Sequence, residues 1–117
     1  MNNSEVKLDF THITDLKHAL PEVIRVMSEG DGRTGRARGD WRNKPESYFV
    51  PKLLRHTVTA AQEGALHVDD KSSLHTLAHV ASLALYLLDK RLSEVAIEAE
   101  HSALPGVSMQ EYGGNST

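Results

Sequence analysis

Residues 68–88 read VDDKSSLHTLAHVASLALYLL and carry the strongest helix signal in the chain. Apolar side chains recur there at spacings of three and four residues, as in a helix with one buried stripe. The members of this stripe are Leu74, Leu77, Ala78, Ala81, Leu85 and Leu88. Ser72 or Ser73 is a candidate N-cap, and Asp69 and Asp70 lie just upstream, where negative charge complements the helix dipole. The stretch therefore predicts a helix that begins near these serines and has a polar N-terminal end.

Two earlier segments show the same periodicity. In the first, Pro21 is unfavourable inside a helix but favoured in a first turn. We therefore expect a short turn or helix before Pro21, and then a helix that runs to about Glu29. The second segment, residues 46–64, predicts another long helix that stops at Gly64, with its regular part beginning near Pro51.

The apolar pattern of the last helix continues beyond Leu88. Either this helix runs to about His101, or it breaks near Asp89 and Lys90 into a further helix. The predicted fold is all-α, a small bundle of three or four helices whose core a second copy completes. The hydrophobic content is a modest 39%, with one Trp, three Tyr and two Phe. Because aromatic residues are few, we expect a core of Leu, Val, Ile and Ala, which suits helices.

The 117 residues fit a single domain. We expect an extended N-terminal segment over 1–11, a helical domain over 12–101 and a disordered tail over 102–117. Within the helical domain, residues 30–45 contain repeated Gly and Arg, which predicts a loop.

The overall charge and composition exclude several classes of protein. A net charge of −3 gives no general attraction to nucleic acid or to an anionic membrane. The absence of cysteine excludes disulfide frameworks and thiolate chemistry. The polar N-terminus resembles no signal peptide, and no apolar run approaches the length of a membrane span. We therefore expect a cytoplasmic protein that binds neither a membrane nor nucleic acid.

An acid–histidine cluster is the first candidate for chemistry. His75 and His79 are four residues apart, so they lie one turn apart on a helix, near Asp69 and Asp70. Two such histidines can chelate one metal ion, and carboxylates add the oxygen ligands that suit Mg²⁺ or Mn²⁺. The alternative is a hydrogen-bonded structural histidine beside ordinary helix N-terminal charges.

Two further groups could bind an anion. Arg55 and His56 lie within the second long helix, where an inward-pointing cation needs a carboxylate or a ligand phosphate. The alternative is that Arg55 extends to solvent. In the Gly/Arg loop, Arg42 is suited to phosphate and Trp41 to stacking on a base. An exposed linker with incidental charge is the alternative there.

The order of these pieces resembles the phage and bacterial dATP/dGTP diphosphohydrolase-like proteins, which are similar to the MazG all-α nucleotide pyrophosphohydrolases. The matching motifs, in chain order, are DWRN at 40–43, LLRH at 53–56, DD at 69–70 and LHTLAH at 74–79. The resemblance covers roughly residues 7–90. Paired carboxylate motifs of the MazG type are absent, and the last helix carries His-x-x-x-His instead.

The resemblance implies hydrolysis of a (deoxy)nucleoside triphosphate to monophosphate and pyrophosphate with Mg²⁺ or Mn²⁺. It implies that Glu22, Asp69 and Asp70 supply the catalytic and metal-binding carboxylates, with Glu29 a further acid candidate. It also implies a nucleotide-binding set. That set is Arg55, His56, His75 and His79, to which the loop adds Arg42 and Trp41. A homo-oligomer is expected.

Two alternatives remain open. The surplus of Arg and His over paired acids favours a phage protein that sequesters a nucleotide signal without catalysis, and tight binding without turnover would indicate it. The second alternative is a helical module that binds a protein or nucleic acid through the Gly/Arg loop. Salt-sensitive DNA binding that depends on Arg33, Arg36 and Arg38 would indicate that module.

Overall fold

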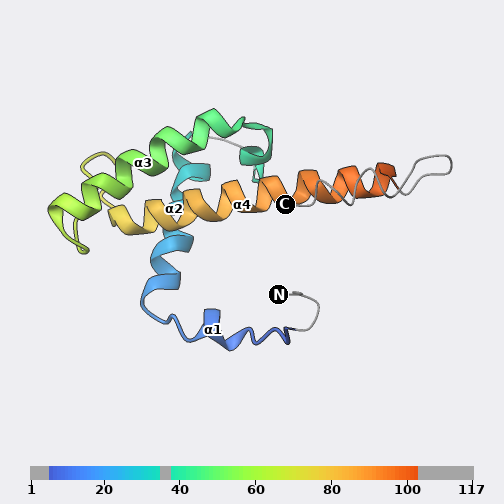
Figure 1. Ribbon diagram of the computed structural model, residues 1–117. Helices are drawn as coiled ribbons and strands as arrows, with labels where there is room; N and C mark the ends of the chain where they lie inside the picture. Colours follow the sequence, from blue (N-terminus) through green and yellow to red (C-terminus); the bar gives the residue numbers. More distant parts are fainter. Residues whose placement is uncertain (1–5, 35–37, 103–117) are drawn as a thin grey trace.

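The structure, a computed structural model, describes residues 6–34 and 38–102. These residues form helices and no β-strand, which confirms an all-α fold for this part of the chain (Figure 1). The elements are α1 (Thr11–Thr14), α2 (Ala19–Thr34), the 3₁₀ helix η2 (Asp40–Asn43), α3 (Glu46–Glu63) and α4 (Thr76–Ser102). None of the described helices combines the length and the apolar character needed to cross a membrane.

Helix α4 is the element on which α2, α3 and η2 pack. Helix α3 runs antiparallel along the first part of α4, and α2 contacts α4 separately (Figure 1). The later part of α4 extends beyond the other helices, and α1 lies apart from them. Residues of α2, α3 and α4 together line the pocket in which the candidate site forms.

The buried core is small. Among the described residues, its buried apolar side chains are Phe49 and Ala60 on α3 and Ala78 on α4. Two polar side chains, Thr76 and Ser82, are buried as well. Phe49 is only 1% exposed and meets the ring of Tyr48 edge-on, with 5.2 Å between centroids. Phe49 is therefore the largest buried apolar side chain of the described core.

Helix α2 confirms the role of Pro21 and corrects the predicted end. Pro21 lies in the first turn of α2, where its missing N–H has no helical partner to lose. The helix then continues through Gly30 to Thr34, although the Gly/Arg loop was expected from residue 30. Two glycines cost roughly 2 kcal/mol of helix propensity, an amount that packing of α2 on α4 can offset.

Helix α3 ends at Gly64 as predicted. Gly64 adopts a φ of 107°, which favours glycine, and its N–H donates to the Ala60 carbonyl at 2.9 Å. The expected regular start at Pro51 is wrong, because α3 is helical from Glu46 with Pro51 inside it. A proline so near the N-terminus removes one backbone hydrogen bond, and burial of Phe49 in the same turns stabilises the helix.

The last helix, α4, is one long helix and not two. It is continuous from Thr76 to Ser102 and does not break at Asp89 and Lys90. Its start is later than predicted, because Ser72 and Ser73 belong to the preceding loop and cap nothing. Residues 6–10 precede α1 without helix or strand, and residues 1–5 and 103–117, with most of the expected tail, lie outside the described residues.

The first prediction concerns the core. Replacing Phe49 with Ala should lower the free energy of unfolding by about 3–5 kcal/mol, because it leaves a cavity at the α3–α4 contact. Leu66→Ala is the matched control, since Leu66 is 82% exposed and its truncation should change stability by less than about 0.5 kcal/mol. Urea unfolding followed by circular dichroism measures both, and equal losses would contradict the packing described.

Candidate functional site

A large pocket lies between α2, α3 and α4, and residues of the loop over 64–75 line one end of it. Its volume is about 1000 Å³, at the upper end of the 300–1,000 Å³ usual for small-molecule sites. Residue Trp41 of η2 and residue Tyr86 of α4 line the opposite end. The pocket thus has an aromatic end and a polar end.

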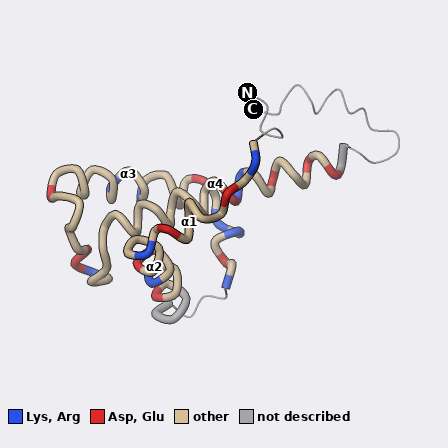
Figure 2. The backbone as a smooth tube through the Cα atoms, turned by 90° about the horizontal axis from the view of Figure 1, so that it is seen from below, with Lys and Arg blue, Asp and Glu red and all other residues tan. Residues whose placement is uncertain are grey.

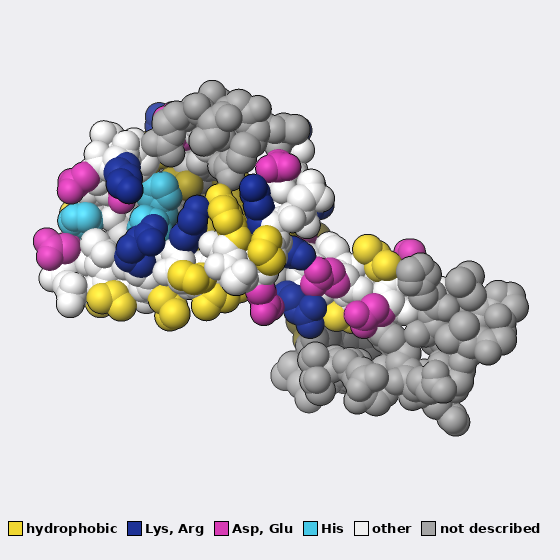
Figure 3. All heavy atoms as spheres, turned by 90° about the horizontal axis from the view of Figure 1, so that it is seen from above, with side chains coloured by type: hydrophobic (Ala, Val, Ile, Leu, Met, Phe, Trp, Pro, Cys, Tyr) yellow, Lys and Arg dark blue, Asp and Glu magenta, His cyan; other side chains and the backbone are white. Residues whose placement is uncertain are grey.

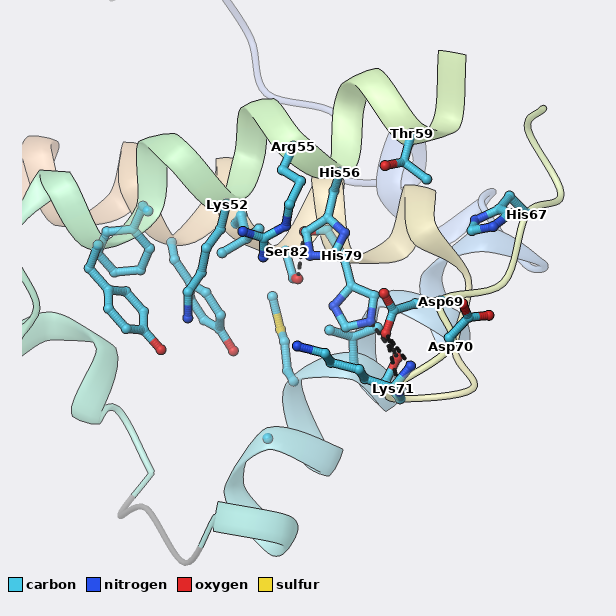
Figure 4. Close-up of a pocket in the computed structure, with 18 of the residues that line it drawn as sticks. Lys52, Arg55, His56, Thr59, His67, Asp69, Asp70, Lys71, His79 and Ser82 are labelled. Carbon is cyan, nitrogen blue, oxygen red and sulfur yellow. Dashed lines mark hydrogen bonds between the residues drawn. The ribbon is translucent and has the colours of Figure 1, made fainter. Parts of the chain in front are cut away.

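Cationic side chains line the middle of this pocket. Lys52 and Arg55 enter from α3 and Lys71 enters from the loop, and all three are directed into the same space (Figure 4). The spacing of three residues between Lys52 and Arg55 puts both on one face of α3. Lys52 Nζ lies 3.8 Å from the centroid of the Tyr48 ring, and this cation–π contact holds the side chain over the pocket.

These cations have no carboxylate partner among the described residues. No carboxylate oxygen of that part of the chain lies within 4.0 Å of the charged groups of Lys52, Arg55 or Lys71. Other cations do have such partners, among them Arg25, Lys44, Lys90 and Arg91. Figure 3 shows the Lys, Arg and His side chains gathered on one face of the molecule. The middle of the pocket is therefore positively charged and suited to an anion.

Two imidazoles stack inside the pocket. The rings of His56 on α3 and His79 on α4 are nearly parallel, at 12°, with centroids 4.9 Å apart. Burial lowers the pKa of His56, the nearby charges of Arg55 and Lys52 lower it further, and the Asp69 carboxylate opposes them. His56 is therefore predominantly neutral near pH 7, and an anion in the pocket would favour its protonated form.

Ser72 connects His79 to Asp69. Its Oγ lies 2.7 Å from His79 Nε2 and 3.1 Å from Asp69 Oδ2, and accepts from the Leu74 N–H at 3.2 Å. An ionised carboxylate only accepts, so the hydroxyl proton goes to Asp69 and the second lone pair of Ser72 remains for His79. Because the Ser72 hydroxyl has no second proton to donate, its contact with His79 is a hydrogen bond only if His79 Nε2 carries a proton.

Asp69 also organises the loop between α3 and α4. Its Oδ2 accepts the backbone N–H groups of Lys71 at 3.1 Å and Ser72 at 2.9 Å, and its carbonyl accepts the Ser73 N–H at 2.8 Å. These bonds hold Ser73 at a φ of 60°, a left-handed conformation uncommon outside glycine. Serines predicted to start the helix are thereby drawn into the loop.

The hydrogen bonds of Asp69 determine its protonation state. Partial burial alone would raise the pKa of the Asp69 carboxyl, but bonds from the Ser72 N–H and hydroxyl, with the charges of His79 and His56, lower it overall. Asp69 is therefore ionised at neutral pH, and its carboxylate serves the loop as well as the pocket.

Two other acids line the pocket, and Glu22 does not. Asp70 and Glu63 are exposed residues at its polar end, next to Asp69. His67 lies there too, with its Nδ1 2.7 Å from the hydroxyl of buried Thr76. Glu22 on α2 lies outside the pocket lining and faces Arg25, with Nε and Oε2 3.7 Å apart. The other α2 acid candidate, Glu29, is also absent from that lining.

The His, Asp and Glu side chains of the pocket are the possible ligands for a metal ion. In the part of the chain that the structure describes, no three His, Asp or Glu side chains come together as ligands for one metal ion. The residues present therefore do not form a complete metal site on their own. They do meet a smaller requirement, because Mg²⁺ that arrives with substrate phosphates needs only one or two protein carboxylates. Asp70, with Asp69 beside it, is the candidate for that role.

The aromatic end is anchored by contacts within the protein. Trp41 stacks on Tyr86 with 4.8 Å between ring centroids and 29° between planes. The guanidinium carbon of Arg42 lies 4.4 Å from the centroid of the Trp41 ring. Trp41 thus attaches η2 to α4, and Arg42 lines a smaller neighbouring hollow rather than the main pocket.

The structure brings together most, but not all, of the predicted site residues. The main pocket contains Trp41, Arg55, His56, Asp69, Asp70 and His79. His75 is not in its lining and instead forms an isolated β-bridge with Val68. Sequence reasoning did not select Lys52, Lys71 or Ser72 as site residues. The spacing of Lys52 from Arg55 and His56 was the available signal, whereas nothing in the sequence indicated how the loop folds.

Comparison of the chain with protein-family models, with curated proteins and with solved structures found no match. The likeness to the diphosphohydrolase-like and MazG proteins therefore stays a prediction from sequence motifs.

The second prediction concerns Asp69. Asp69→Ala should lower the free energy of unfolding by about 1–3 kcal/mol at pH 7, because it leaves the loop N–H groups without their acceptor. Asp70→Ala, at the exposed neighbouring residue, is the control and should change it little. The pKa of Asp69 is lowered in the folded protein, so the carboxylate's contribution is fully present above about pH 4. It is lost as the pH falls through the folded-state pKa.

Urea denaturation of both variants across the acid range measures this effect. The difference between the wild type and Asp69→Ala should narrow at low pH. A difference that stayed constant with pH, or one equal to that of Asp70→Ala, would contradict the loop role of Asp69.

Proposed function

We propose that the pocket binds the phosphate groups of a nucleotide, with a (deoxy)nucleoside triphosphate as the ligand class. The observation that carries this proposal is the convergence of Lys52, Arg55 and Lys71 on one space without carboxylate partners among the described residues. Phosphate oxygens accept charge-assisted hydrogen bonds from Lys and Arg, and a triphosphate carries several such groups in a row.

The dimensions and the two ends of the pocket support a nucleotide rather than a bare phosphate ion. A volume of about 1000 Å³ exceeds what a single phosphate requires and accommodates a base and sugar as well. The aromatic end, lined by Trp41, Tyr48 and Tyr86, offers apolar surface beyond the cationic middle. A nucleotide with its phosphates at Arg55 and its base toward Tyr86 matches this polarity.

A second candidate function is metal-dependent hydrolysis of the same ligand to monophosphate and pyrophosphate, as in the MazG-like enzymes that the motifs resemble. The placement of Asp70 and Asp69 at the polar end, next to the cationic side chains, favours it. Mg²⁺ or Mn²⁺ bound with the nucleotide would neutralise phosphate charge and help to generate the attacking water. Lys52, Arg55 and Lys71 would then bind and orient the phosphates. Binding is placed first because no complete metal site is present among the described residues.

Nothing in the described part of the chain favours an interaction module that acts through the Gly/Arg loop. Residues 35–37, with Arg36 among them, lie outside the described residues, and much of the preceding segment belongs to α2.

The third prediction tests nucleotide binding. Replacing Arg55 with Gln should weaken binding of a dNTP by about 10- to 100-fold, because a charge-assisted contact to phosphate is worth about 1.5–3 kcal/mol. Arg91→Gln is the matched control, since Arg91 lies on α4 outside the pocket and pairs with Glu46 and Glu94. Calorimetry with the four dNTPs, with and without Mg²⁺, gives the affinities. No binding of any dNTP by the wild type would overturn the proposal.

The fourth prediction separates hydrolysis from binding alone. If the second candidate holds, the wild type releases pyrophosphate from at least one dNTP with Mg²⁺ or Mn²⁺, and Asp70→Asn lowers kcat by at least about 100-fold. Asp89→Asn, on the exposed surface of α4, should leave the rate unchanged. Pyrophosphate release at high enzyme concentration is the measurement. Tight dNTP binding without pyrophosphate would leave binding as the function and reject the enzyme.

A further inference from the structure

The face of α3 that lines the pocket changes its chemistry along the length of the helix. Its side chains recur at spacings of three and four residues, so they share one side of α3. In chain order they include Tyr48, Lys52, Arg55, Thr59 and Gln62, with Glu63 next to the last. The sequence of groups therefore runs from an aromatic ring through cations to neutral polar side chains and an acid. Figure 2 shows the change of charge along α3, where Lys and Arg positions are followed by an acidic position at the end of the helix.

The polar end of the pocket extends well beyond the cations. A helix rises about 1.5 Å per residue, so Thr59 lies roughly 6 Å and Glu63 roughly 12 Å beyond Arg55 along the axis. Figure 4 shows Thr59, His67 and Asp70 toward one end of the pocket and Lys52 toward the other. The pocket therefore has room for a further chemical group beyond phosphates that are bound at Arg55.

The polar side chains at this end have unused hydrogen-bonding capacity. They are Thr59, Gln62, Glu63, His67 and Asp70, and are named here the distal subsite. Within the described part of the chain, the side chains of Thr59, Gln62, Glu63 and Asp70 form no hydrogen bond or ion pair. By contrast, the hydroxyl of Thr57, on the same helix, donates to the Leu53 carbonyl at 2.7 Å. The distal subsite thus offers both donors and acceptors to a ligand.

This mixture of groups suits a neutral partner with several hydroxyls. A hydroxyl both donates and accepts, so it can pair with a carboxylate, an amide or another hydroxyl. A terminal phosphate carries roughly −1.5 to −2 charge at pH 7, and the carboxylates of Glu63 and Asp70 would repel it. A triphosphate therefore places its last phosphate there only with a cation between, as the second candidate function requires. A neutral group needs no such cation.

We propose that the distal subsite holds a sugar joined to the second phosphate of the nucleotide, so that the pocket also takes nucleoside diphosphate sugars. The base then lies toward Tyr86, the two phosphates lie among the cations of the middle, and the sugar lies between Thr59 and Asp70. Each phosphate of such an ester carries one charge, which Lys and Arg side chains can neutralise without a metal ion. The inference rests on the proposed nucleotide binding and assigns a second ligand class to the same site.

Calorimetry with the full chain in EDTA tests the proposal, with the glucose esters of ADP, GDP, CDP and dTDP as ligands. At least one ester should bind at least about 10-fold more tightly than the triphosphate of the same base, because its sugar meets the carboxylates without repulsion. Esters that bind no more tightly than the triphosphates would overturn the inference and leave nucleotide binding intact. Absence of binding by any ester, diphosphate or triphosphate would overturn the inference together with the proposed function.

Replacing Thr59 with Val separates the sugar from the phosphates. This change removes only the hydroxyl, so it should weaken binding of the ester by about 3- to 10-fold and leave the parent diphosphate nearly unaffected. Thr57→Val is the matched control, because Thr57 lies on the same helix outside the pocket lining, and it should change neither affinity. Equal losses for the ester and the diphosphate, or equal effects of the two variants, would contradict a sugar at Thr59.

Saturation-transfer NMR on the wild type gives a measurement that needs no variant. Irradiation of the protein should saturate the glucose ring protons of the bound ester as well as those of the nucleoside, because both lie inside the pocket. Saturation confined to the nucleoside would place the sugar in solvent and overturn the inference.

Discussion

The hydrogen bonds of the Asp69 carboxylate are the interaction on which the site depends. They close the connection between α3 and α4 by holding the backbone N–H groups of Lys71 and Ser72. Through Ser72 they also fix the ring of His79, which stacks on His56 of the other helix. One carboxylate thus sets the loop, the position from which Lys71 enters the pocket, and the contact between the two imidazoles.

The chemistry of the pocket follows from where charge is and is not neutralised. Asp69 is engaged with the loop, so it does not lie within ion-pair distance of Lys52, Arg55 or Lys71. Binding of a polyanion requires unneutralised cations in a large cavity, and the proposed ligand, a nucleoside triphosphate, is such a polyanion. Among the described residues, no three His, Asp or Glu side chains come together as ligands for one metal ion.

Much of the fold could be predicted from sequence, and part of the site could not. Helical periodicity located α3 and α4, and Pro21 and Gly64 indicated a helix start and a helix end. The start of α4 was misplaced because Ser72 and Ser73 look like caps until the tertiary bonds of Asp69 are known. For the same reason His75, one helical turn from His79 in the sequence prediction, lies in the loop and outside the pocket. Lys71 was passed over because a lysine in a turn is ordinarily solvated.

A crystal structure with a non-hydrolysable dNTP and Mn²⁺ tests the central claim most directly. We expect triphosphate density in the pocket, with phosphate oxygens within hydrogen-bond distance of Lys52, Arg55 and Lys71 and the base toward Tyr86. Anomalous signal from Mn²⁺ beside Asp70 would add support for hydrolysis. A nucleotide bound elsewhere on the protein, with this pocket filled only by water, would contradict the account.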